Sequence, residues 1–340
     1  MRGLLIVNPR ATTAAEGAAE LVTRSLAGVV DLDVEQTRHR GHARDLAAGA
    51  AASADLVLVL GGDGALNEAV NGVMAASASD PASGSGSVSG SVSGSASGGA
   101  AGRITGPGGA MGSRRPLIGV IPGGGGNVFA RAMGLPVDPA GAVSRIRQAI
   151  EGERYRTIGL GLAGDRYFMF SADLGWDAEV VREVDRQREK GSRQSVSLYV
   201  RTIVREYYRG TDRRVPALTL ERDGRPQAGE LFMAIITNRS PWTYVGGRAL
   251  LPVPNPDFNS GLDLLAMRRL RVGTVMQAVG QMLWVRSRPA RGRHLLSEPG
   301  LEALTIRSAR PIAFQVDGEY LGETRGVDFR FVPGALRVVA

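Results

Sequence analysis

The chain has 340 residues, of which 43% are hydrophobic and 22% are charged, and this is the balance of a folded protein with room for about two domains. It has no cysteine, which excludes disulfides, thiolate metal sites and a cysteine nucleophile, and its three histidines argue against a multi-histidine metal centre. The formal net charge of +8 suits phosphate-bearing small molecules, an anionic membrane surface or nucleic acid. No apolar run approaches the ~18 residues of a spanning helix. We therefore expect a cytoplasmic protein that meets membranes only at their surface.

The first part of the chain alternates apolar strand patterns with helical patterns. The predicted strands are 4–7, 32–35, 56–60 and 117–121, and the predicted helices are 14–26, 42–52, 66–74 and 127–133. Such an alternation predicts a parallel sheet that is covered by helices on both faces. The stretch 75–113 interrupts it and consists almost entirely of Ala, Ser and Gly. We interpret this stretch as a flexible loop inserted within a domain, because it has too little apolar bulk to offset the entropy of ordering.

Short strand patterns dominate from about residue 155 onwards. The candidates are 167–172, 217–221, 230–237, 262–267, 304–307, 312–316, 327–331 and 336–339, with helices at 193–209 and 274–286. This half is therefore predicted to be mostly antiparallel. We place the domain boundary at residue 145, which gives domains 1–145 and 146–340 with a binding cleft between them.

Two of the apolar strands run into a glycine-rich turn and then a helix, at residues 61–64 and 123–126. A helix N-terminus offers unpaired N–H groups and a positive dipole end, so two such turns in one domain predict binding of a nucleotide phosphate chain. Neither turn has the Gly-Lys-Ser/Thr of a Walker loop, and Asn67 and Phe129 occupy the last position of a Gly-x-Gly-x-x-Gly pattern. A P-loop NTPase or a conventional dinucleotide fold is therefore disfavoured. The alternative for each turn is an ordinary tight connection between a strand and a helix.

Three acidic residues stand out beside these features. Asp63 lies within the first turn, where a carboxylate next to phosphates implies an intervening Mg²⁺, although it could equally be a helix N-cap. Asp317 and Glu319 follow an apolar run and, at i and i+2 of an extended chain, face the same way. One of them could accept a proton while the other holds a metal, and the alternative is a plain Asp-Gly hairpin turn.

Arginines gather in two further places. The helical pattern at 195–208 carries Arg201, Arg205 and Arg209 on one face, and a second cluster contains Arg286, Arg288, Arg291 and Arg293. Each is either an ordinary solvated face or a surface for anionic lipid headgroups. The aromatic content of 5% and the lack of a recognised module argue against a nucleic-acid partner.

Several short blocks occur in a fixed order along nearly the whole chain. They are Asn8-Pro9 and the stretches 37–43, 61–68, 122–131, 175–178 and 317–319. Together they resemble the diacylglycerol kinase catalytic domain, a family shared by bacterial lipid kinases and sphingosine kinases. The resemblance implies an N-terminal Rossmann-like α/β domain that binds ATP and is similar to NAD kinase and phosphofructokinase. It also implies a C-terminal antiparallel β-sandwich, with the active site between the two domains.

The resemblance further implies roles for individual residues. Asp317 would be the base that faces the lipid hydroxyl, with Glu319 as its companion on the metal side. Mg²⁺ would be held by Asp63, Asp177 and Glu319. ATP would be bound by Asn8, Pro9, Arg10, Ala11, Thr12, Thr37, Gly61, Gly62, Asp63, Gly64, Ala65, Leu66, Asn67, Glu68, Gly124, Gly125, Gly126, Asn127 and Arg131.

The chain departs from the family pattern at a few positions. Ala65, Gly125 and Val128 stand where the family usually has Thr, Thr and Asp, so backbone N–H groups would have to replace two hydroxyls near the phosphates. Residues 259–261 read Asn-Ser-Gly in place of an Asp-Asp-Gly that binds a structural magnesium.

The sequence thus predicts an ATP- and Mg²⁺-dependent lipid kinase, with diacylglycerol as the first acceptor and a sphingoid base or another lipid as the alternative. Two rival interpretations stay open. One is a related kinase for a soluble acceptor, similar to NAD kinase, and the other is a nucleotide-sensing protein that has lost turnover. The expected partners are a membrane lipid and an anionic membrane surface, and a homodimer is left open.

Overall fold

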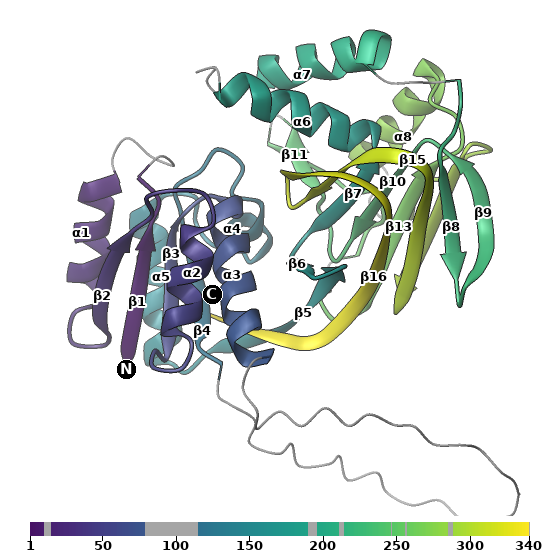
Figure 1. Cartoon of the computed structure of the whole chain (residues 1–340). Helices are drawn as coiled ribbons and strands as arrows, with labels where there is room; N and C mark the ends of the chain where they lie inside the picture. The colour runs from purple at the N-terminus through teal and green to yellow at the C-terminus, as the bar shows by residue number, and fades with distance from the viewer. Residues whose placement is uncertain are drawn as a thin grey trace, which may run out of the picture.

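The computed structural model describes residues 1–9, 15–78, 115–189, 196–210, 214–245, 247–255, 257–284 and 288–339. Figure 1 shows two lobes, one built from the first part of the chain and one from the second. Of the predicted loop 75–113, residues 75–78 continue a helix, contrary to the prediction, directly after the core residues Val73 and Met74 of the same helix. The rest of that stretch lies outside the described residues.

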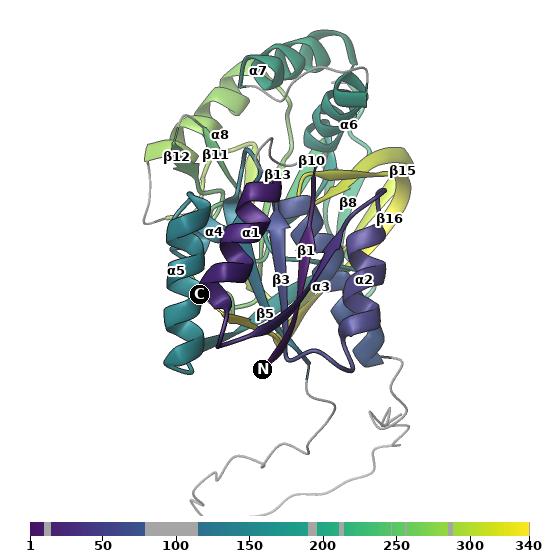
Figure 2. The ribbon, with the colours of Figure 1, turned by 90° about the vertical axis from the view of Figure 1, so that its left-hand side faces the viewer.

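The first lobe holds the predicted parallel sheet. Its strands lie in the order β2 (Asp31–Gln36), β1 (Arg2–Val7), β3 (Leu56–Gly61) and β4 (Leu117–Pro122), and every adjacent pair is parallel. One face is covered by α1 (Ala15–Leu26) and α5 (Pro139–Glu151), and the other by α2 (His42–Ala50) and α3 (Asp63–Ala78) (Figure 2). The short α4 (Val128–Ala132) packs in the same core cluster as α2 and α3. Because both faces are covered, β3 and β4 are buried along their whole length, as their continuous apolar runs predict.

The second lobe is antiparallel, which confirms the prediction for this half of the chain. Its main strands follow the order β14 (Leu295–Leu301), β13 (Leu262–Met267), β10 (Met233–Thr237), β7 (Ser171–Gly175), β15 (Ala303–Val316) and β16 (Glu319–Val339). The remaining strands are β5 (Tyr155–Ala163), β6 (Arg166–Phe168), β8 (Leu218–Arg222), β9 (Arg225–Leu231) and the separate pair β11 (Thr243–Val245) and β12 (Arg248–Leu250). A hydrophobic core gathers between β8, β10, β13, β15 and β16.

The long strand β16 connects the two lobes (Figure 1). It pairs with β15 in the second lobe, then with β5, and finally runs parallel to β4 where Val338 lies opposite Ile118. Its last residues therefore belong to the core of the first lobe. Residue 145, the predicted domain boundary, lies inside α5, and the whole of that helix packs on the first lobe.

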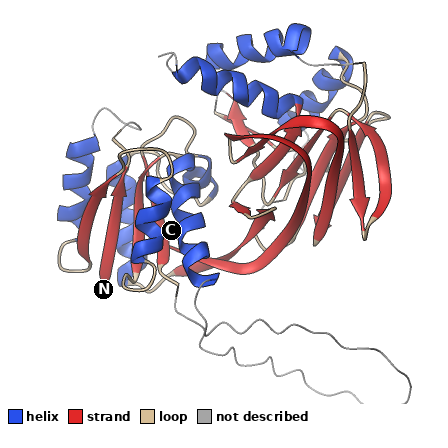
Figure 3. Ribbon diagram, in the orientation of Figure 1, coloured by secondary structure: helices blue, strands red, loops and turns tan. Residues whose placement is uncertain are grey.

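Helices cover one face of the second lobe (Figure 3). They are α6 (Trp176–Glu189), α7 (Val196–Arg205) with a π-helical turn at Glu206–Gly210, and α8 (Val272–Trp284). Buried residues of α6, the π-helical turn and α8 form one cluster with β10 and β13. No helix within the described residues is both long and apolar enough to cross a bilayer.

Candidate active site

The two glycine-rich turns lie against each other. They leave neighbouring parallel strands at the same sheet edge, where Gly61 is paired with Pro122, and the Gly123 N–H donates to the Gly61 carbonyl at 2.9 Å. A Cβ atom added to Gly124 would come within 2.7 Å of the Gly62 Cα. Only glycine allows this approach, so the two turns form one backbone-lined edge.

Asp63 joins the two turns. It is the first residue of α3, and its carboxylate accepts hydrogen bonds from the N–H groups of Val128 at 2.9 Å and Phe129 at 3.0 Å. It therefore caps α4 across the turns, a variant of the N-cap alternative. Burial raises the pKa of Asp63, and the hydrogen bonds from Phe129 and Val128 oppose that shift. Asn127 closes the second turn with φ of 46° and side-chain hydrogen bonds to both backbone groups of Gly124.

One turn of helix further on, Asn67 connects α3 to the second lobe. Residues at i and i+4 share a helix face, so Asn67 lies on the same side of α3 as Asp63. Its amide nitrogen donates to the Asp317 carboxylate at 2.7 Å and to the Tyr167 carbonyl at 2.9 Å. Asp317 therefore lies beside the helix that begins at the glycine turns.

The Asp317 carboxylate is surrounded by hydrogen-bond donors at the turn between β15 and β16. Its carboxylate accepts from the N–H groups of Met169 at 2.9 Å, Phe170 at 2.9 Å and Ser171 at 3.1 Å, in addition to Asn67. These four donors fill the four acceptor directions of a carboxylate. Burial raises the pKa of Asp317 to about 6, although all four hydrogen bonds act in the opposite direction.

Glu319 faces two arginines. One carboxylate oxygen accepts from Arg40 at 2.6 Å, and the other accepts from Arg166 at 2.8 Å. Arg166 also donates from Nε to the side-chain oxygen of Asn67 at 2.9 Å. Glu319, Arg166, Asn67 and Asp317 thus form one continuous polar chain across the site.

Asp177 belongs to a separate buried cluster. The Gln315 amide nitrogen donates to Asp173 and, at 3.3 Å, to Asp177, while its oxygen accepts the Gly318 N–H at 2.7 Å. Burial raises the pKa of Asp173 well above its usual range and also raises that of Asp177, and the charge of Asp177 adds to the shift at Asp173. Through Gln315 the pair supports the turn that carries Asp317.

The three predicted Mg²⁺ ligands are therefore held by different partners. Among the described residues, no three His, Cys, Asp or Glu side chains are gathered closely enough to hold a metal ion. Asp63 alone lies at the glycine turns. A single carboxylate still fits a magnesium ion that arrives with a nucleotide, because Mg²⁺ is commonly bound through one or two carboxylates together with phosphates and waters.

Several other predicted ATP contacts lie near the ends of β1 and β2 or in the core of the first lobe. At the ends of β1 and β2, the Asn8 N–H donates to Leu60 and the Thr37 N–H donates to Val7, both at 2.9 Å, so these residues lie at the edge that carries the glycine turns. The Leu66 side chain is fully buried in the core of the first lobe, so it has no free surface for ATP. The predicted contacts Arg10, Ala11 and Thr12 lie outside the described residues.

Glu68 and Arg131 border the same region. The Glu68 carboxylate accepts the Gly41 N–H at 2.9 Å and so ties α3 to the turn before α2. The Arg131 guanidinium lies 4.9 Å from the ring centre of Tyr244, which brings a residue of the second lobe next to α4.

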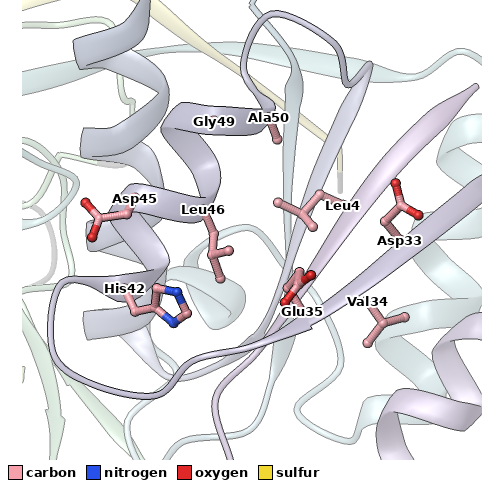
Figure 4. A pocket seen from close by; sticks show the side chains of 9 residues that line it. All are labelled: Leu4, Asp33, Val34, Glu35, His42, Asp45, Leu46, Gly49 and Ala50. Atoms are coloured by element: carbon pink, nitrogen blue, oxygen red, sulfur yellow. The ribbon is translucent and has the colours of Figure 1, made fainter.

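A pocket of about 510 Å³ lies elsewhere, between β2 and α2 (Figure 4). Its polar lining comes from Asp33, Glu35, His42 and Asp45. Of the residues in the motif blocks it includes only His42, and it contains none of the predicted catalytic acids. We therefore do not assign the candidate active site to this pocket.

Comparison with known proteins shows which proteins this chain is similar to. Residues 2–155 match the family model described as the diacylglycerol kinase catalytic domain. This part of the chain carries a diacylglycerol kinase catalytic domain. The chain is 24% identical over 280 residues to the diacylglycerol kinase of Bacillus subtilis, a match that covers 80% of this chain and 73% of that protein. It is 27% identical over 278 residues to that of Staphylococcus carnosus, covering 79% and 71%.

A solved structure extends the similarity to the whole fold. A diacylglycerol kinase from Bacillus anthracis superposes with a TM-score of 0.70 at 20% identity, over 99% of this chain and 96% of that one. This confirms the predicted fold class. The family model and the relatives support a kinase, and the solved structure shows the fold.

Several residues of the site are missing from the sequence prediction. Arg166 and Arg40 hold Glu319, and Asp173 and Gln315 support the Asp317 turn. Of these, Arg40 stands within a motif block, and the position of Gln315 two residues before Asp317 is a signal that could have been used. Arg166 and Asp173 lie outside every motif block.

Proposed function

We propose that this protein transfers the γ-phosphate of ATP to the hydroxyl group of a membrane lipid, with diacylglycerol as the first candidate acceptor and phosphatidic acid as its product. The observation that carries the proposal is the hydrogen bond between Asn67 and Asp317. It joins a buried carboxylate in the second lobe to the helix whose N-terminus forms an anion-binding edge. A kinase needs this combination of a phosphate-binding edge and a proton acceptor.

In this proposal the chain's own residues bind, orient and accept a proton. The backbone N–H groups of the two glycine turns bind the ATP phosphates. Asp63 would hold Mg²⁺ through water, and the ion would neutralise phosphate charge. Asp317 accepts the hydroxyl proton at Oδ2, where the lipid hydroxyl replaces the hydrogen bond from Asn67, the only side-chain donor among its four partners. A pKa of about 6 keeps Asp317 ionised and basic at neutral pH.

A peripheral membrane contact fits the exposed face of α8. Val272, Met276 and Trp284 lie on one side of this helix and are 50%, 63% and 69% exposed, while Thr274, Ala278 and Met282 are buried on the other. Arg248 lies 5.4 Å from the ring centre of Trp284. An apolar face bordered by arginine is the arrangement that binds the surface of anionic lipid bilayers.

The experiment is transfer of labelled γ-phosphate from ATP to separate acceptors in mixed micelles: diacylglycerol, monoacylglycerol, a sphingoid base and a polyprenol, with NAD as a soluble acceptor. We expect the highest rate with diacylglycerol. A higher rate with another lipid would correct the acceptor and keep the class of enzyme. Label on NAD alone would overturn the lipid assignment.

A second candidate is a nucleotide-binding regulator without turnover, and one observation favours it. All four acceptor directions of Asp317 are filled in the structure, so no lone pair faces an incoming hydroxyl. The same experiment separates the two, because a regulator binds ATP but labels no acceptor.

A further inference from the structure

Arg166 lies between the phosphate-binding edge and Asp317. Its Nε donates to the side-chain oxygen of Asn67 at 2.9 Å, and the nitrogen of the same Asn67 amide donates to Asp317 at 2.7 Å. One amide group therefore separates the guanidinium from the proposed base. The Arg166 side chain is only 18% exposed, and the hydrogen bond to Asn67 fixes its position beside α3.

We propose that Arg166 binds the γ-phosphate of ATP during transfer, an inference that rests on the proposed function. The γ-phosphate has to lie between the glycine turns and Asp317, along the face of α3 that carries Asp63 and Asn67. Arg166 borders this face. Its guanidinium offers parallel N–H donors that match phosphate oxygens, and phosphoryl transfer depends on such positive groups around the moving phosphate.

Glu319 marks the anion site on this arginine. Its carboxylate binds Arg166 at 2.8 Å and Arg40 at 2.6 Å, so an anionic group already occupies the outer edge of both guanidinium groups. The Arg166 Nε stays bound to Asn67 when the anion is exchanged. The γ-phosphate and the Glu319 carboxylate therefore compete for the same N–H donors of Arg166.

This chain also has a particular need for such a residue. Ala65 and Gly125 provide no hydroxyl groups near the phosphates. Arg166 supplies a charged side-chain donor to a site whose other phosphate contacts are chiefly backbone N–H groups.

The test compares the affinities for ATP and ADP by titration calorimetry, with EDTA present so that no metal contributes. We expect Arg166→Gln to weaken ATP binding about tenfold or more and to leave ADP binding unchanged, because it removes charge-assisted hydrogen bonds to the γ-phosphate, which ADP lacks. The affinity of Arg166→Lys for ATP should lie between those of the wild-type protein and Arg166→Gln. Lysine keeps the positive charge but lacks the parallel N–H donors of the guanidinium group. Arg182→Gln is the matched control. Arg182, like Arg166, pairs with a glutamate of β16, but its ion pair with Glu323 is exposed.

Glu319→Gln provides a prediction of opposite sign. Removal of the competing carboxylate should raise the affinity for ATP several-fold relative to ADP. The inference is overturned if Arg166→Gln changes both affinities equally or neither, or if Glu319→Gln lowers the ratio of ATP to ADP affinity. If the wild-type protein binds neither nucleotide, the proposed function fails and this inference falls with it, so the two failures are distinguishable.

Discussion

Asp317 offers the sharpest test, because two large effects on its carboxyl group oppose each other. Burial raises its pKa from 3.8 to about 6, while three backbone N–H groups and Asn67 stabilise the charged form. In the perturbation Asp317→Asn, the group that titrates is replaced by one that does not. A difference of about 2 pKa units corresponds to about 3 kcal/mol in the free energy of unfolding.

The sign follows from proton linkage. A carboxyl group whose pKa is higher in the folded state stabilises that state below the unfolded pKa, and this stabilisation is lost as the pH rises through about 6. The wild-type protein should therefore lose about 3 kcal/mol of stability relative to Asp317→Asn between about pH 4 and pH 7. Urea unfolding of both proteins, followed by tryptophan fluorescence, measures this difference at each pH.

Asp165→Asn, in the exposed turn between β5 and β6, reports the general effect of removing one negative charge. If the four hydrogen bonds outweigh the effect of burial, the pKa of Asp317 is lowered. The wild-type protein then gains stability relative to the variant as the pH rises through about 4. That result would refute the reasoning from burial and would leave Asp317 a poor base.

Two further predictions concern the phosphate edge and the membrane. Gly124→Ala should weaken ATP binding at least tenfold, because its Cβ would push the two glycine turns apart. The control Gly49→Ala has open space around the added Cβ and should leave ATP binding unchanged. Equal affinities of the two variants in equilibrium titrations would argue against a phosphate site at the turns. The double variant Met276→Ser and Trp284→Ser should sediment severalfold less with phosphatidylglycerol vesicles than the wild-type protein. Val137→Ser, at another exposed apolar position, is its control, and equal losses for both would remove α8 from the membrane contact.

Much of the fold could be predicted from the sequence where a strand is apolar and ends at glycine. The strands β1, β3 and β4 lie within a residue or two of their predicted bounds, because continuous apolar runs are typical of a sheet covered on both faces. The helices α5 and α6 were missed. In α6, charged residues interrupt the apolar spacing, and the packing that fixes this helix comes from distant strands.

Tertiary contacts explain the errors in the second lobe. The predicted strand 167–172 is split into β6 and β7, because the N–H groups of Met169 and Phe170 donate to Asp317, which lies far along the chain. The predicted strands 327–331 and 336–339 are one strand, since a bulge between Val332 and Leu336 lets β16 continue past a proline. Neither effect has a local sequence signal.

The site was predictable only where its geometry requires a particular residue type. The glycine turns were found because their geometry requires glycine, and the structure brings them together. The partners of the acids were not predictable from local patterns. Asp63 caps α4 across the glycine turns within the first lobe, and Glu319 pairs with Arg40 because the two lobes meet there. No spacing within the sequence records either contact.

In the proposed reaction, Asp317 accepts the proton of a lipid hydroxyl beside ATP bound at the glycine turns. The most direct measurement is single-turnover transfer of labelled γ-phosphate from ATP to diacylglycerol between about pH 5 and pH 8. We expect a rate that falls about tenfold per pH unit below about 6, is constant well above that pH, and is at least a hundredfold lower in Asp317→Asn. A rate that does not change with pH across this range, or one that Asp317→Asn leaves intact, would show that Asp317 is not the proton acceptor.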